Sequence, residues 1–149
     1  MIEHRFTPGT VHLVRLEHGD DVYDALTGFA RDHTIRAATV TALGAVSRAS
    51  LRYYDQAARR YVDFVVDEPL EVVAAIGNLS LLDGRPFLHL HAALADAAGH
   101  GYGGHVHTGT VAFALEATIV ELQGDPPVRV PDPATGLTLW GPPGGDATR

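Results

Sequence analysis

The chain of 149 residues contains neither cysteine nor lysine, and all 11 of its basic residues are arginine. The absence of cysteine excludes disulfide bonds and thiolate metal ligands, so histidine and carboxylate side chains remain as candidates for holding a metal ion. No apolar run approaches the roughly 18 residues that a membrane-spanning helix requires, and the first residues lack the pattern of a secretory signal. We therefore expect a cytoplasmic protein with no membrane partner.

Positive charge is also scarce, because 18 acidic residues leave the chain with a net charge of −7. An acidic surface repels a phosphate backbone unless its arginines gather on one side. The candidates for such a cluster are Arg48, Arg52, Arg59 and Arg60. Nucleic-acid binding through them is an alternative function that the overall charge disfavours.

The helix is predicted by one apolar stripe. Over residues 21–33 the apolar positions recur at helical spacing, behind Asp20 or Asp21 as the N-terminal cap and with Arg31 near the C-terminal end.

Alternation, β-branched residues and turn signals predict strands elsewhere. The expected strand ranges are 10–16, 35–43, 45–54, 61–66, 70–82, 86–94 and 103–121, with a short edge segment at 137–140. Gly44 is either a bulge or a tight bend, residues 47–66 form a hairpin, and a kink is expected at Gly77.

The pattern as a whole defines the fold class. Many short-linked strands and one helix indicate a single α+β domain over residues 1–149, built on a mostly antiparallel sheet of seven to eight strands. We place its core at about residues 10–122 and expect the Pro/Gly-rich tail, 123–149, to run over the surface, with a mobile end from residue 141.

Two His-x-His pairs, His89/His91 and His105/His107, are the strongest functional signal. If residues 86–107 form an antiparallel hairpin centred near Ala98, His91 lies opposite His105 and His89 opposite His107. Opposed residues have Cβ atoms roughly 4.5–5.5 Å apart, which allows several imidazoles to reach one ion. Three histidines and a water form an open zinc site, although Fe, Ni, Co or Cu would accept the same ligands.

The residues alone leave alternatives open at this site. A single His-x-His pair is more often part of a solvated sheet face, so a metal site requires that the two pairs lie together. His107 is a fourth ligand, a neighbour of the ligands or a bystander. Glu71 could reach a metal or a neighbouring subunit, but such a strand residue more often faces solvent.

Several stretches together resemble the plants-and-prokaryotes-conserved domain family (PPC or PCC). They are Gly19–Val22, Phe29–His33, Gly44–Ser47, Leu51–Asp55, Leu70–Val73, Gly77–Asn78, Leu88–Ala92, Gly103–His105 and Gly109–Val111. The resemblance implies an α+β domain that assembles as a homotrimer. It also implies a divalent-metal site at His89, His91 and His105, with His107 where a leucine is more usual.

The family carries two functional associations. In plants the domain comes after AT-hook segments in the same chain, and prokaryotic members are often labelled as DNA-binding. Here Gly84-Arg85-Pro86 matches the core of an AT-hook, but its surroundings predict a hairpin turn. Acetolactate decarboxylase is similar in fold and in a His-x-His plus His zinc site, which suggests a metal-dependent enzyme without assigning a reaction. We therefore expect a three-histidine metal domain, with zinc as the cofactor, and keep a DNA-binding or regulatory assembly module without catalysis as the alternative.

Overall fold

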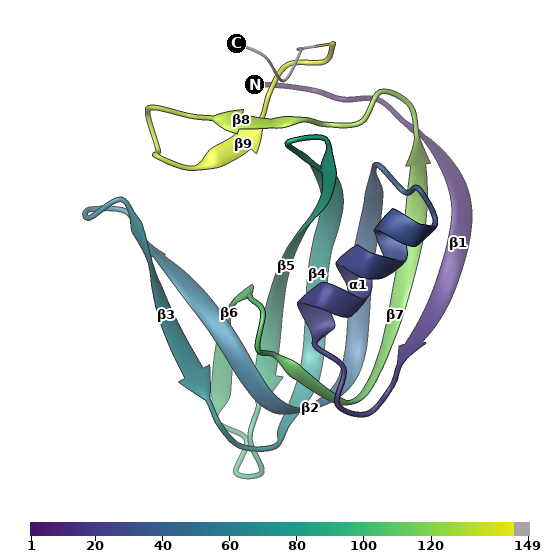
Figure 1. The fold of residues 1–149 in the computed structure, drawn as a ribbon. Helices are drawn as coiled ribbons and strands as arrows, with labels where there is room; N and C mark the ends of the chain where they lie inside the picture. Colours follow the sequence, from purple (N-terminus) through teal and green to yellow (C-terminus); the bar gives the residue numbers. More distant parts are fainter. Residues whose placement is uncertain (145–149) are drawn as a thin grey trace.

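Seven strands pair into one antiparallel sheet, and a single helix packs across one of its faces (Figure 1). The computed structural model describes residues 1–144. The elements are β1 (Thr7–Leu16), α1 (Val22–Asp32), β2 (Ala38–Asp55), β3 (Arg60–Val66), β4 (Leu70–Leu82), β5 (Arg85–Ala95), β6 (Gly101–Val106), β7 (Val111–Gln123), β8 (Arg129–Pro131) and β9 (Thr138–Trp140). The strand order of the main sheet is β1-β7-β2-β4-β5-β6, with β3 paired to β2. The predicted fold class is confirmed.

Helix α1 forms where its capping residues and apolar stripe predict it. The Asp21 carboxylate accepts a hydrogen bond from the Asp24 backbone N–H at 3.0 Å, which satisfies one free donor of the first turn. Val22, Leu26 and Ala30 are buried against the sheet. Within residues 1–144, no helix is long and apolar enough to cross a membrane.

Strand β2 is the longest element, and its two halves serve different neighbours. Its first half pairs with β4 and β7, and its second half pairs with β3 and β6. Gly44 lies at a register shift, has a φ of +132°, and approaches Ala114 so closely that a Cβ would lie 2.1 Å from its carbonyl oxygen. The two predicted strands are therefore one strand with a bulge at Gly44.

Two of the predicted strand ranges differ from the structure. The predicted run 103–121 is two strands, because Gly109 adopts a φ of +98° and the Thr110 N–H donates to the His107 carbonyl oxygen at 3.3 Å. The turn residues Thr108 and Gly109 were the signal for this break. Strand β4 is uninterrupted at Gly77, so the predicted kink there is wrong.

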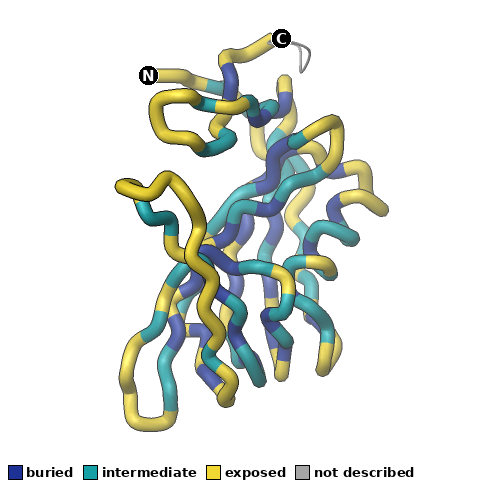
Figure 2. The backbone as a smooth tube through the Cα atoms, turned by 60° about the vertical axis from the view of Figure 1, so that its left-hand side comes forward, coloured by how far each residue is buried: buried dark blue, intermediate teal, exposed yellow. Residues whose placement is uncertain are grey.

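The two faces of the sheet have different surroundings. Leu26, Val40, Leu90 and Ile119 are at most 1% exposed and form the core with α1. Buried segments follow the middle of the strands, whereas hairpin tips and chain ends are exposed (Figure 2). The opposite face carries a continuous row of in-register residues: Leu13, Thr118, Thr41, Ile76, His91 and His105. His91 and His105 therefore lie on the face opposite Leu90 and the core that α1 covers.

The C-terminal segment adds a small two-stranded sheet, β8–β9, at one end of the main sheet (Figure 1). Leu81 of β4 donates its N–H to Pro127 at 2.9 Å, and the Tyr54 hydroxyl donates to the Thr135 carbonyl oxygen at 2.6 Å. The expected edge segment 137–140 is β9. Of the predicted mobile end, residues 145–149 lie outside the described part of the chain.

Candidate metal centre

The β5–β6 hairpin brings the two histidine runs together in the predicted register. His91 pairs with His105, and Ala92 with Gly104. Leu90 and Val106 point the other way and are buried. The predicted pairing of His89 with His107 is wrong, because β6 leaves β5 after His105 and turns to pair with Leu51 and Arg52 of β2.

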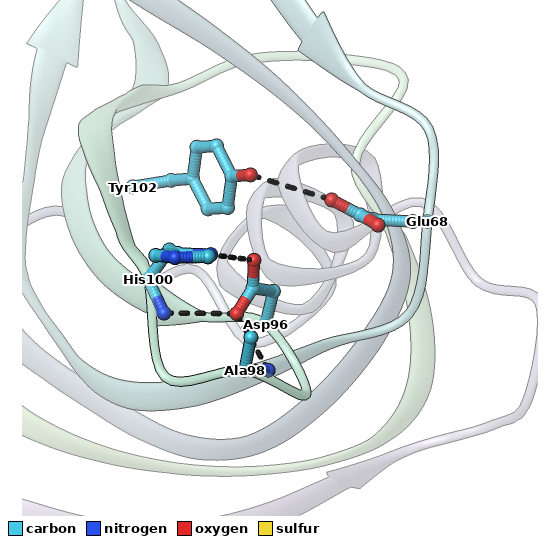
Figure 3. Close-up of polar contacts among 5 residues, drawn as sticks. All are labelled: Glu68, Asp96, Ala98, His100 and Tyr102. Carbon is cyan, nitrogen blue, oxygen red and sulfur yellow. Dashed lines mark hydrogen bonds and ion pairs between the residues drawn. The ribbon is translucent and has the colours of Figure 1, made fainter.

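The turn between β5 and β6 is held together by polar contacts of Asp96 (Figure 3). The Asp96 carboxylate accepts hydrogen bonds from the backbone N–H groups of Ala98 and His100, both at 2.8 Å, and contacts His100 Nδ1 at 2.9 Å. These hydrogen bonds lower the pKa of Asp96, and the bond from the His100 backbone N–H has the largest effect. The Tyr102 hydroxyl donates to Glu68 at 3.4 Å, which ties β6 to the loop before β4. His100 itself is exposed, as expected for a turn residue.

Three imidazoles form a compact triangle on this hairpin. The ring centroids are 5.1 Å apart for His89–His91, 5.2 Å for His89–His105 and 5.5 Å for His91–His105. One ring nitrogen from each residue lies within 4.8 Å of the other two. This cluster is able to hold a metal ion.

Burial keeps two members of the triangle neutral. Desolvation, Arg129 and His91 together lower the pKa of His89 from 6.5 to about 4. Desolvation, followed by the neighbouring histidines, lowers the pKa of His105 to about 4 as well. Because a metal binds the unprotonated imidazole, both side chains are in the metal-binding form at neutral pH.

The spacing of the donor atoms fits a metal ion. His89 Nε2 and His91 Nε2 are 3.2 Å apart, and two nitrogens bound to tetrahedral zinc at ~2.0–2.1 Å would be about 3.3 Å apart. In addition, His105 Nδ1 is buried and, among the described residues, has no hydrogen-bond partner. Neutral imidazoles suit zinc, and they equally suit iron, copper or nickel.

Gly77 of β4 allows β5 to approach at the position of His89. A Cβ at Gly77 would lie 2.1 Å from the His89 carbonyl oxygen and 2.8 Å from Leu90 Cα. Only glycine permits this contact between the two backbones. Gly77 therefore helps to position the first histidine of the triangle.

The two other candidates lie outside the triangle. The His107 ring stacks on Tyr23 of α1 at a centroid distance of 6.3 Å, and its backbone N–H donates to Ser50 at 3.0 Å. Glu71 is exposed and pairs with Ala95, the last residue of β5, whereas His89 lies near the middle of that strand. Neither belongs to the group of converging ligand atoms.

A cavity of about 770 Å³ opens beside the triangle. Its wall is formed by β2, β3, β5 and β6, by Tyr23 of α1, and by the C-terminal segment 136–139. Tyr61 lies next to the histidine triangle, with its ring centroid 5.7 Å from that of His105. The volume is typical of pockets for small molecules.

Sequence reasoning missed the contribution of the C-terminal segment and of Arg129. The Arg129 side chain is 8% exposed, lines the cavity, and places Nη2 at 3.3 Å from His89 Nδ1. The available signal was a lone charged residue in Val128-Arg129-Val130, between two prolines.

The four arginines proposed as a nucleic-acid cluster are not equivalent. Arg48 and Arg52 form ion pairs with Asp67 at 3.4 Å and Asp63 at 2.8 Å. Arg59 donates to the Pro133 carbonyl oxygen at 3.4 Å, and Arg60 is exposed. Arg52, Arg59 and Arg60 all line the cavity.

The fold and the site define a small α+β domain with a three-histidine cluster beside a cavity. The chain belongs to the Plants and Prokaryotes Conserved (PCC) domain family, whose model matches residues 3–123.

The similar proteins have varied descriptions. A metal-containing protein from Archaeoglobus fulgidus is 38% identical, with a TM-score of 0.90 over 94% of this chain and 99% of that one. A protein from Ralstonia eutropha with a provisional DNA-binding name is 26% identical, with a TM-score of 0.78 over 88% and 90%. The bifunctional protein GlmU of Synechococcus sp. strain JA-3-3Ab is 39% identical over 85% of this chain; the match spans 19% of GlmU.

The expected likeness to acetolactate decarboxylase holds for the fold alone. A Staphylococcus aureus protein described as similar to that enzyme aligns with a TM-score of 0.55 at 17% identity.

Proposed function

We propose that the domain binds one divalent metal ion, zinc in particular, through His89, His91 and His105, and presents it to a small molecule in the adjoining cavity. The observation that carries this proposal is the convergence of three ligand nitrogens within 4.8 Å of one another. The metal-containing description of the A. fulgidus relative supports it.

The protein's own groups would bind and orient the small molecule. A metal held by three histidines keeps at least one position open, and when bound it would act as a Lewis acid or activate a water molecule. The cavity wall beside it is rich in tyrosine and arginine. The reaction, if one occurs, stays unassigned.

The proposal is tested by the metal content of protein purified without an affinity tag. We expect one zinc per chain, and almost none in His89→Ala. The exposed His18, which contacts the Phe113 carbonyl oxygen at 3.2 Å, provides the matched control His18→Ala, with unchanged zinc. Zinc at a hundredfold excess over Kd should stabilise the wild type by about 2.7 kcal/mol. Purified protein that contains no metal, and whose melting temperature does not change when Zn²⁺ is added, would contradict the proposal.

We also propose that the chain assembles as a homotrimer through the sheet face opposite α1. That face exposes large apolar side chains, namely Val11, Leu13, Leu43, Val73, Ile76 and Phe113. Exposed apolar patches of this kind are typical of interfaces. Ile76 lies beside His91 in the same row, so a neighbouring subunit would approach the metal site. Sedimentation equilibrium should give three times the chain mass for the wild type and a smaller species for Leu13→Glu. A monomeric wild type would refute the trimer.

DNA binding is the alternative function, supported by the provisional name of the R. eutropha relative. The carboxylate partners of Arg48 and Arg52, together with the net charge of −7, disfavour it. We expect no binding of a labelled duplex at low salt. Binding that weakens with salt, and is lost in an Arg59→Gln/Arg60→Gln variant, would favour the alternative.

A further inference from the structure

The cavity is cationic although the chain has a net charge of −7. Among residues 1–144, its lining includes four arginines and four histidines but no aspartate or glutamate. Arg52 is neutralised by Asp63, whereas Arg59 and Arg60 are exposed near the mouth. Arg129 differs from all three, because it is 8% exposed and forms no ion pair with any described residue.

The contacts of Arg129 fix its position without neutralising its charge. Its Nε donates to Ser80 Oγ at 2.9 Å, and Nη1 donates to the Thr138 carbonyl oxygen at 2.9 Å. The guanidinium lies over the Phe87 ring, with Cζ 4.6 Å from the centroid. All three partners are neutral. A buried cation is costly unless a negative charge accompanies it, so an anion would be bound favourably here.

The contact between Arg129 and His89 points to where that anion sits. A metal-binding histidine usually donates its second ring N–H to a carboxylate, a carbonyl oxygen or water. Here the group 3.3 Å from His89 Nδ1 is Arg129 Nη2, which can only donate. With a metal on Nε2, Nδ1 carries the proton, and two N–H donors would face each other. An anionic oxygen that accepts from both donors removes the conflict.

We propose that the cavity binds a small organic carboxylate whose oxygens accept hydrogen bonds from Arg129 and from the Nδ1–H of His89. The planar guanidinium matches a carboxylate. Arg129 is the one buried arginine of the described cavity wall, so it balances the single charge of a carboxylate but not the two charges of a phosphate dianion. The remaining wall offers aromatic and apolar surface for the organic body, including Tyr61, Phe87, Leu137 and Leu139. This inference rests on the proposed metal site.

Carboxylate and zinc binding should therefore strengthen each other. The carboxylate stabilises the Nδ1–H form of His89, the form that binds metal through Nε2, and the coupling is reciprocal. We expect saturating carboxylate to lower the Kd for zinc by about tenfold, the lower end of the effect of a partner that orients a metal-binding histidine.

The test compares acetate, propionate and benzoate with their neutral isosteres acetamide, propionamide and benzamide, by calorimetry on zinc-loaded and zinc-free protein. At least one carboxylate should bind the zinc-loaded wild type, with its amide at least tenfold weaker. Arg129→Gln should lose this binding and retain one zinc per chain, while Arg129→Lys, which keeps the charge, should show partial binding. Arg36→Gln, at an exposed arginine outside the cavity wall, should behave as wild type.

Three results with the wild type would overturn the inference: no carboxylate binds the zinc-loaded protein, the amides bind as well as the acids, or inorganic phosphate binds more tightly than every carboxylate. These wild-type comparisons stand even if an Arg129 variant fails to fold. Carboxylate binding that persists unchanged in Arg129→Gln would overturn it too. Zinc stoichiometry is measured separately, so failure of the metal site is distinguished from failure of the anion site.

Discussion

Replacing Gly77 with alanine should weaken zinc binding, although Gly77 is not one of the three proposed ligands. The new Cβ would lie 2.1 Å from the His89 carbonyl oxygen and 2.8 Å from Leu90 Cα, both of them backbone atoms that cannot rotate away. Even a tight contact of 3.0 Å requires β4 and β5 to separate by about 0.9 Å at this pair. Metal–ligand distances tolerate only about 0.2 Å, so His89 would leave its ligand position.

We expect Gly77→Ala to lower the free energy of unfolding of the metal-free protein by about 3 kcal/mol, the upper end for overpacking. For a domain of this size the melting temperature should fall by about 6–12 °C. The affinity for zinc should drop at least about tenfold. Chemical denaturation and zinc titration calorimetry measure the two effects.

Gly28→Ala is the matched control for this prediction. A Cβ at Gly28 of α1 meets only Arg31 Nη2, at 3.6 Å, which is ordinary contact. Alanine should stabilise the helix there by about 0.5–1 kcal/mol and leave zinc affinity unchanged. If Gly77→Ala were as stable as the wild type and bound zinc equally well, the argument from the close β4–β5 approach would be refuted.

Three further predictions concern the site and its scaffold. Since the pKa values of His89 and His105 are about 4 in the folded chain against 6.5 for an ordinary histidine, the unfolded chain binds more protons between these values. Their contribution to the stability of metal-free protein should be complete above about pH 6.5 and decline as the pH falls toward about 4; imidazole NMR shifts that move near pH 6.5 would contradict this. Asp96→Ala removes the acceptor that fixes the hairpin turn, so the melting temperature and zinc affinity should both decrease, and unchanged zinc affinity would show that the turn does not set the register. His107→Ala should retain one zinc per chain by elemental analysis, because His107 lies outside the converging ligands; loss of zinc would make it a ligand.

The helix and the histidine register could be predicted because both depend on local signals. The cap and stripe of α1 lie within a dozen residues, and a hairpin centred near Ala98 can pair His91 only with His105 or with residues close to it. In contrast, His89 does not pair with His107, because the pairing of β6 with β5 ends at His105 and the end of β6 pairs with β2. That pairing with β2 depends on Leu51 and Arg52, which are far away in the sequence.

The cavity could not be predicted for the same reason. Its wall combines β2 and β5 with the C-terminal segment, which the sequence predicted to run over the surface. The residues next to Arg129 in the sequence do not indicate that its side chain approaches Ser80 and His89. The resemblance to a family separated His107 from the other three histidines, a distinction that spacing alone did not provide.

Zinc binding by the three histidines can be tested by anomalous X-ray diffraction at the zinc absorption edge, on crystals of untagged protein grown without added metal or chelator. We predict one peak per chain, bonded to His89, His91 and His105. Density showing His89 Nε2 hydrogen-bonded to His91 Nε2, with no anomalous peak between the three rings even after soaking in Zn²⁺, would contradict it.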